Sequence, residues 1–120
     1  MYSINEVNDL LDDIASNLPE ELFRDLNGGV SLLSEAKRNE ADPQGRLYTL
    51  GEYRRDQMGR YIVIYYGPIC AVHGDNTYDE LRENLDRLLR HELTHHLESL
   101  SGERGLEIKD GLELDKYLGR

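Results

Sequence analysis

The sequence predicts a single α+β domain spanning residues 1–120, with N-terminal helices, a small sheet of three to four strands, and then a long helix. Apolar residues recur at helical spacing near the N-terminus and again after position 77, whereas the segment between is rich in β-branched, aromatic and alternating residues. A length of 120 residues suits one domain with a modest core.

Two helices are expected before the sheet. Ser3 and Glu6 form an S-x-x-E capping box ahead of an apolar stripe, which predicts a helix over residues 4–17. A short second helix is expected from Pro19 to the glycine pair at positions 28 and 29, because proline suits a first helical turn and glycine suits a helix end. Both helices are expected to serve as scaffold.

Three strands are predicted next, over Val30 to Lys37, Arg46 to Arg54 and Arg60 to Tyr66, with the last two forming a hairpin. The stretch from Gly67 to Gly74 has the composition of a loop. The third strand is the most hydrophobic. If it lay at the edge of the sheet near the long helix, its backbone could pair with an extended peptide. An ordinary core strand is the alternative.

A long helix is predicted from Thr77 to about Ser101. Thr77 and Glu80 form a second capping box, and leucines recur at helical spacing between positions 81 and 100. This helix therefore has one apolar face that packs on the rest of the domain.

The long helix carries the pattern His-Glu-x-x-His at His91, Glu92 and His95. One helical turn separates the two histidines, so both imidazoles project from one face beside the leucine stripe and can bind one zinc ion. The Glu92 carboxylate can act as general base on an attacking water. Because the chain has a single cysteine, these residues indicate a catalytic rather than a closed structural site. An exposed helix edge with two unrelated histidines is the alternative.

The remaining histidines and the cysteine are assigned to structure. His96 falls inside the leucine arc, so it is expected to be a core histidine that donates to a carbonyl or carboxylate rather than a third ligand. His73 is expected at the surface. Cys70 is expected to act as a small apolar residue rather than as a nucleophile.

Composition limits the partners. A net charge of −10 disfavours nucleic acid and anionic membrane surfaces, and the acidic residues are spread along the chain as on a solvated surface. No apolar run is long enough to span a membrane, and no signal peptide is evident. A single cysteine excludes an internal disulfide framework. The expected location is the cytoplasm.

Four stretches carry a family resemblance: Leu18 to Glu21, Leu47 to Tyr53, Tyr61 to Ile69, and His91 to His96 with its doubled histidine. Through these stretches, the sequence resembles the small zincin-like metallopeptidase family of bacteria, also described as minimal zincins. The resemblance covers nearly the whole chain. The resemblance implies a minimal zincin-like fold with a long active-site helix and a short C-terminal segment. It also implies one catalytic zinc and peptidase activity, and it is compatible with a homodimer.

The third zinc ligand is expected beyond the helix. Aspartate-type zincins place glycine three residues after the second ligand histidine and aspartate three residues later, whereas this chain has Glu98 at the first of those positions. Gly102 suits a helix end that lets the chain reverse. Asp110 is the expected ligand because the family pattern implies an aspartate after the turn, and Glu107 is the alternative. Asp110 could instead form a capping box with Glu113. Glu98 is awkwardly placed on the same helix.

The sequence thus predicts a zinc-dependent metallopeptidase that hydrolyses peptide or protein substrates. Zn²⁺ would be held by His91, His95 and Asp110, with Glu92 as the general base. The alternative is a zinc-binding regulatory or interaction module with weak or no proteolytic activity, because a chain of 120 residues has little room for deep specificity pockets. A metal-free structural protein is a third possibility.

Overall fold

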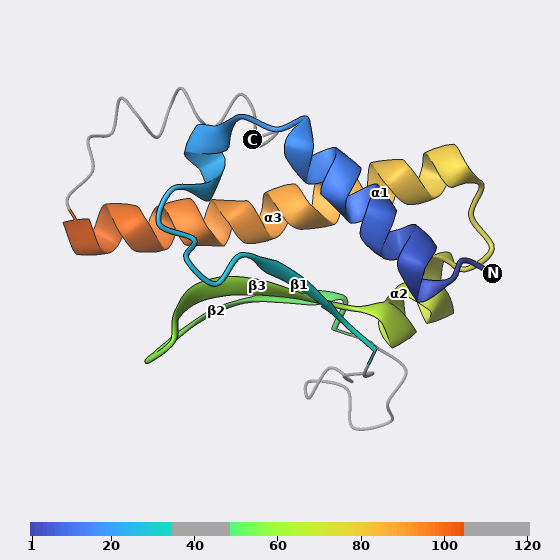
Figure 1. Ribbon diagram of the computed structural model, residues 1–120, viewed down its shortest axis with the longest axis horizontal. Coiled ribbons are helices and arrows are strands. Elements are labelled where there is room, and N and C mark those ends of the chain that lie inside the picture. Colours follow the sequence, from blue (N-terminus) through green and yellow to red (C-terminus); the bar gives the residue numbers. More distant parts are fainter. Residues whose placement is uncertain (35–48, 105–120) are drawn as a thin grey trace.

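A computed structural model of the chain describes residues 1–34 and 49–104, and these residues form an α+β arrangement. The elements in chain order are the helix α1 (Ile4–Ser16), the short 3-10 helix η1 (Glu20–Phe23), the strands β1 (Val30–Leu33), β2 (Gly51–Asp56) and β3 (Gly59–Tyr65), and the helices α2 (Tyr66–His73) and α3 (Tyr78–Arg104). Helices α1 and α3 lie on the same side of the sheet (Figure 1). The predicted α+β class is confirmed.

The sheet is mixed, with the strand order β1-β3-β2. Strand β1 runs parallel to β3, with Val30 opposite Ile62, and β2 runs antiparallel to β3, with Gly51 opposite Ile64. The predicted hairpin is therefore confirmed. The hypothesis that the third strand is the edge is wrong, because β3 is paired on both sides and its aliphatic residues belong to the core. Within the described residues, β2 is the edge strand that contacts α3.

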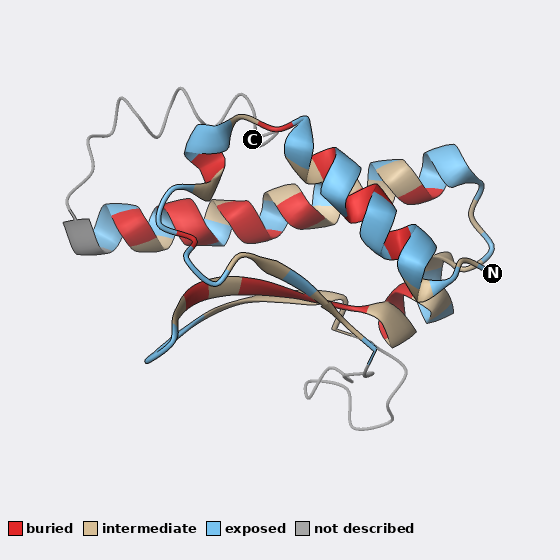
Figure 2. Ribbon diagram, viewed as in Figure 1, coloured by how far each residue is buried: buried red, intermediate tan, exposed pale blue. Residues whose placement is uncertain are grey.

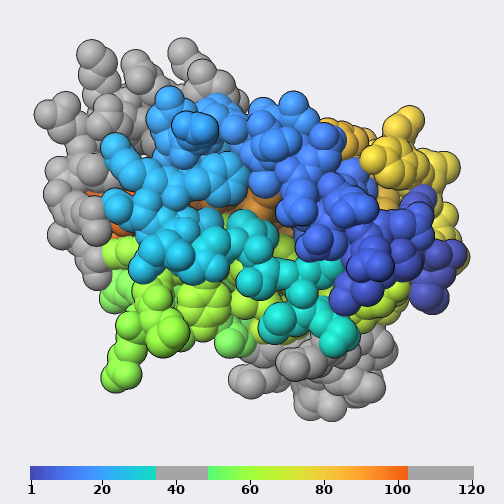
Figure 3. Space-filling view, in the orientation of Figure 1, coloured from blue at the N-terminus to red at the C-terminus, as the bar shows by residue number. Residues whose placement is uncertain are grey.

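The core lies between the two helices and the inner face of the sheet. The buried stripes of α1 and α3 face each other and the sheet (Figure 2). Its members are apolar side chains of α1, η1, β3, α2 and α3, among them Val7, Leu10, Ile14, Leu22, Ile62, Ile64, Ile69, Leu81, Leu85, Leu89 and Leu93. In the space-filling view, atoms of the N-terminal segment lie in front of the middle of α3 (Figure 3). Within the described ranges, no helix is both long and apolar enough to cross a bilayer.

The predicted starts of the two main helices are confirmed in atomic detail. Ser3 Oγ accepts from the Glu6 N–H at 3.1 Å, and the Glu6 carboxylate accepts from the Ser3 N–H at 3.0 Å. Thr77 and Glu80 exchange the same pair of bonds at 3.2 and 2.8 Å. These bonds satisfy amide groups that a helix start otherwise leaves unpaired.

Three sequence-based boundaries are wrong. The stretch from Gly67 to Gly74 is mostly the helix α2 rather than a loop, because Pro68 lies in its first turn, where a missing N–H costs nothing. The short second helix ends at Phe23 instead of continuing to the glycine pair. Helix α3 continues through Gly102 to Arg104. Residues 35–37 and 46–48 of the predicted strands lie outside the described residues, and β2 begins only at Gly51.

The β2–β3 turn depends on Gly59, whose φ of 113° disfavours any other residue. A Cβ at this position would also collide with the side chain of Asn27. We expect Gly59→Ala to lower the free energy of unfolding by about 1 to 3 kcal/mol, measured by urea denaturation. The matched control is Gly102→Ala in α3, where a Cβ meets no atom within 4 Å and alanine favours the helix. Equal destabilisation of both variants would contradict this account of the turn.

Candidate functional site

Helix α3 brings His91 and His95 together as its spacing predicts. Their Nε2 atoms are 3.2 Å apart, the ring centroids are 4.7 Å apart, and the ring planes are nearly perpendicular at 89°. Both residues are exposed to solvent. The pair therefore presents two imidazole ligands from adjacent turns of one rigid helix.

The spacing of these nitrogens fits a tetrahedral zinc ion. Two Zn–N bonds of about 2.0 to 2.1 Å at the tetrahedral angle place the nitrogens about 3.3 to 3.4 Å apart. The separation of 3.2 Å lies within about 0.2 Å of that requirement. Among residues 1–34 and 49–104, no group of three His, Cys, Asp or Glu side chains is close enough to hold a metal. The expected third ligand, Asp110, and its alternative, Glu107, lie outside the described residues.

Glu92 lies beside the two histidines, but its side chain is buried, with 5% of its surface exposed. This burial raises the pKa of the Glu92 carboxyl above its usual value. The charges of His91 and His95, together with the backbone N–H of Tyr53, act in the opposite direction and favour the carboxylate. The result is a desolvated carboxyl group next to the imidazole pair, which is an arrangement suited to accepting a proton.

The three residues open onto a cavity of about 650 Å³ between α3 and the edge strand β2. Its lining consists of Gly51, Glu52, Tyr53, His91, Glu92, His95 and Ser99. Tyr65 N–H donates to the Leu50 carbonyl at 3.0 Å, so the alternation of an antiparallel pair turns the backbone groups of Gly51 and Tyr53 away from β3. The cavity thus has an imidazole pair on one wall and a strand edge on the other.

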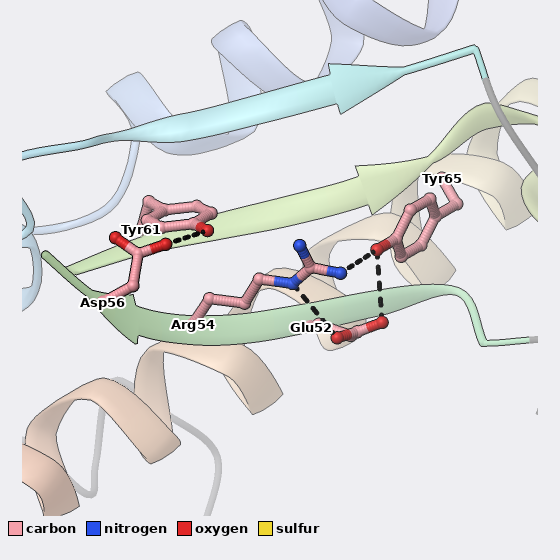
Figure 4. A network of polar contacts seen from close by, with 5 residues as sticks. All are labelled: Glu52, Arg54, Asp56, Tyr61 and Tyr65. Atoms are coloured by element: carbon pink, nitrogen blue, oxygen red, sulfur yellow. Dashed lines mark hydrogen bonds and ion pairs between the residues drawn. The ribbon is translucent and has the colours of Figure 1, made fainter. Parts of the chain in front are cut away.

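A polar network fixes β2 to β3 on the face of the sheet opposite α3 (Figure 4). Arg54 Nη2 donates to the Tyr65 hydroxyl at 3.0 Å, and that hydroxyl donates to Glu52 Oε1 at 3.1 Å. Arg54 Nε lies 3.3 Å from Glu52 Oε2. Nearer the turn, the Tyr61 hydroxyl donates to Asp56 at 2.7 Å. Cross-strand pairs of this kind stabilise the hairpin and so hold the strand edge that lines the cavity.

His96 is a core residue, as predicted, and its protonation follows from its partners. Its ring is fully buried, and burial lowers the pKa of His96, so the imidazole is neutral. Nε2 lies 2.7 Å from the Arg24 carbonyl, which can only accept, so Nε2 carries the proton. Nδ1 therefore accepts from the Tyr53 hydroxyl at 3.0 Å. Arg60 Nη1 donates to the same hydroxyl at 3.1 Å.

Replacing His96 with phenylalanine tests its structural role. The change leaves the Arg24 carbonyl and the Tyr53 hydroxyl hydrogen without their partner, so we expect the free energy of unfolding to fall by about 1 to 3 kcal/mol. Any zinc that the parent chain binds should bind this variant equally well, because Tyr53 and Arg24 occupy both ring nitrogens of His96. Chemical denaturation and elemental analysis measure the two quantities. Loss of zinc from a still folded variant would show that His96 is a ligand.

The other described histidine, cysteine and glutamate residues that the sequence analysis considered do not line this cavity. His73 ends α2, and its Nδ1 lies 3.0 Å from the Asn76 side chain. Cys70 is half-buried in α2, with its sulfur near the Tyr2 carbonyl. Glu98 is exposed on α3. Sequence reasoning missed Ser99 as a lining residue, although its spacing of four residues after His95 places it on the same helix face.

No protein-family model matches the sequence, and no curated protein matches it either. Among solved structures, the chain is similar to a conserved hypothetical protein from Thermo thermophilus, with a TM-score of 0.70 and 29% sequence identity. The similarity covers 83% of this chain and 98% of that protein. The two proteins therefore share one fold over most of their lengths.

Proposed function

We propose that this chain is a zinc-dependent metallopeptidase with a minimal zincin-like fold. The observation that carries the proposal is the 3.2 Å approach of the His91 and His95 Nε2 atoms beside the buried Glu92, within a cavity that a strand edge also lines. Metal-assisted peptide hydrolysis uses metal ligands, a general base and a surface that binds an extended peptide. The two imidazoles, Glu92 and the strand edge could supply these parts. The sequence resemblance to minimal zincins points to the same function.

His91 and His95 would hold the zinc ion, and Asp110, or alternatively Glu107, would complete the protein ligands. When bound, zinc acts as a Lewis acid that lowers the pKa of water toward about 7 and polarises a substrate carbonyl. The two histidines are suited to this role because one helix carries both, one turn apart, and their Nε2 atoms already lie 3.2 Å from each other. Three protein ligands would leave a position open for chemistry.

Glu92 would take the proton of the attacking water and return it to the leaving amine. Burial raises the pKa of this carboxyl, which brings it closer to the working pH and improves proton transfer in both directions. The backbone N–H of Tyr53 favours the charged form and restricts the carboxylate. Glu92 is thus both reactive and oriented before a substrate arrives.

Strand β2 would bind the substrate in an extended conformation. The backbone groups of Gly51 and the carbonyl of Tyr53 are directed away from β3, so a peptide could pair with this edge as an added strand while the Tyr53 N–H interacts with Glu92. This pairing would lay the peptide beside the imidazole pair, because the same cavity contains both. The sequence suggested the third strand as the edge that pairs with a peptide, and this proposal assigns that pairing to β2 instead. Main-chain pairing would accept varied sequences, with side-chain pockets setting preference.

The test uses purified, untagged full-length chain loaded with zinc. We expect about one zinc per chain by elemental analysis, and cleavage of unfolded protein or a mixed peptide library detected by mass spectrometry. A chelator should stop cleavage, and added zinc should restore it. A chain that binds no zinc even when zinc is supplied would contradict the proposal. Stoichiometric zinc without cleavage would instead favour a zinc-binding interaction module.

A further inference from the structure

The buried Arg60 side chain links two residues that line the cavity, Tyr53 and Ser99. It rises from β3, with 7% of its surface exposed. The nitrogen Nη1 lies 3.1 Å from the Tyr53 hydroxyl and 2.7 Å from the Ser99 Oγ. A guanidinium Nη1 has two hydrogens and cannot accept, so it donates one hydrogen to each oxygen.

The direction of every bond in this cluster then follows. The Tyr53 hydroxyl gives its own hydrogen to His96 Nδ1, because the other nitrogen of that ring donates to the Arg24 carbonyl. Ser99 Oγ accepts from Arg60, so its hydroxyl hydrogen must point elsewhere. Within residues 1–34 and 49–104, that hydrogen has no acceptor, and Ser99 lines the cavity.

We propose that Ser99 is the hydrogen-bond donor of the cavity, and that it binds the carbonyl oxygen of the substrate and the negative charge that develops there. This inference rests on the proposed peptidase function and adds an oxyanion-stabilising group to it. Ser99 lies one helical turn beyond His95, on the same face as the imidazole pair. Accepting from a buried guanidinium polarises its hydroxyl and makes it a stronger donor. A fixed donor aimed at developing charge is a large contributor to catalysis.

The test compares binding of acetohydroxamate, a small carbonyl compound that binds zinc through oxygen, to zinc-loaded full-length variants by calorimetry. We expect Ser99→Ala to raise the dissociation constant about 3- to 10-fold, the effect of losing one hydrogen bond. Ser99→Thr retains a hydroxyl and should stay within about 2-fold of the parent chain. The matched control is Ser101→Ala, two residues along the same helix at an exposed position, which should leave binding unchanged.

Zinc content and melting temperature are measured for each variant. The inference is overturned if Ser99→Ala binds the probe as tightly as Ser101→Ala while both hold one zinc, and in that case the metallopeptidase proposal stands. A parent chain without zinc would overturn both proposals. Weakened binding in Ser99→Ala with unchanged zinc content, restored in Ser99→Thr, supports a hydroxyl donor and excludes general loss of structure.

Discussion

Replacing His95 with alanine is expected to weaken zinc binding by more than about 100-fold. Removing an outer-shell partner of a zinc ligand alone costs about 10- to 100-fold in affinity, and loss of a direct ligand should cost more. His91→Ala should have the same effect, because the two Nε2 atoms face each other across 3.2 Å and neither can be replaced by a described neighbour. The dissociation constants follow from competition with a chromophoric zinc chelator.

The control is His73→Ala, which removes the same side chain from α2. This imidazole contacts Asn76 and has no place in the cavity, so zinc affinity should be unchanged within about 2-fold. If His73→Ala weakened zinc binding as strongly as His95→Ala, the imidazole pair would not be the specific metal site. Because His91 and His95 are exposed, neither substitution should greatly change the free energy of unfolding of the metal-free chain.

The second large effect is expected when Glu92, the proposed general base, is replaced. Glu92→Gln should lower kcat for peptide cleavage by about 10²- to 10⁴-fold, because glutamine cannot take the proton of the attacking water. Glutamine has nearly the same shape and keeps an oxygen that can face the Tyr53 N–H, so the fold and the zinc content should be retained. Cleavage rates and elemental analysis of the same preparation measure the two quantities.

Glu83→Gln is the matched control for this variant. Glu83 lies on the same helix, where its exposed carboxylate pairs with Arg87 at 3.3 Å, far from the cavity lining. Its removal should change kcat by less than about 2-fold, since an exposed ion pair contributes little. An active Glu92→Gln variant with normal zinc content would rule out Glu92 as the base. A variant that lost both zinc and activity would indicate a structural role.

Local signals in the sequence were sufficient for the helices that carry the site. The two capping boxes fix where α1 and α3 begin, and the leucine spacing identifies the buried face of α3. Because His91 and His95 are one turn apart, their convergence follows from helix geometry alone. The buried position of His96 follows from the same periodicity. These features depend on neighbours within a few residues, so no tertiary information is needed.

The sheet order and the far wall of the cavity depend on tertiary contacts. Hydrophobicity identified β3 as a strand but could not show whether it is central or at the edge, since this depends on the pairing of β1, which lies about 30 residues earlier in the sequence. The short helix α2 was missed because glycine and proline at its start also suit a loop. Ser99 acquires its role only through Arg60 on a different element.

The central claim is a zinc site built on His91 and His95, and the crystal structure of the zinc-loaded chain tests it most directly. The account predicts one zinc ion about 2.0 to 2.1 Å from the Nε2 atom of each histidine. It also predicts a carboxylate oxygen from Asp110 or Glu107 as the third protein ligand, and a fourth position facing the cavity between β2 and α3. Zinc bound elsewhere, or two imidazoles that point apart in the zinc-loaded protein, would contradict the account.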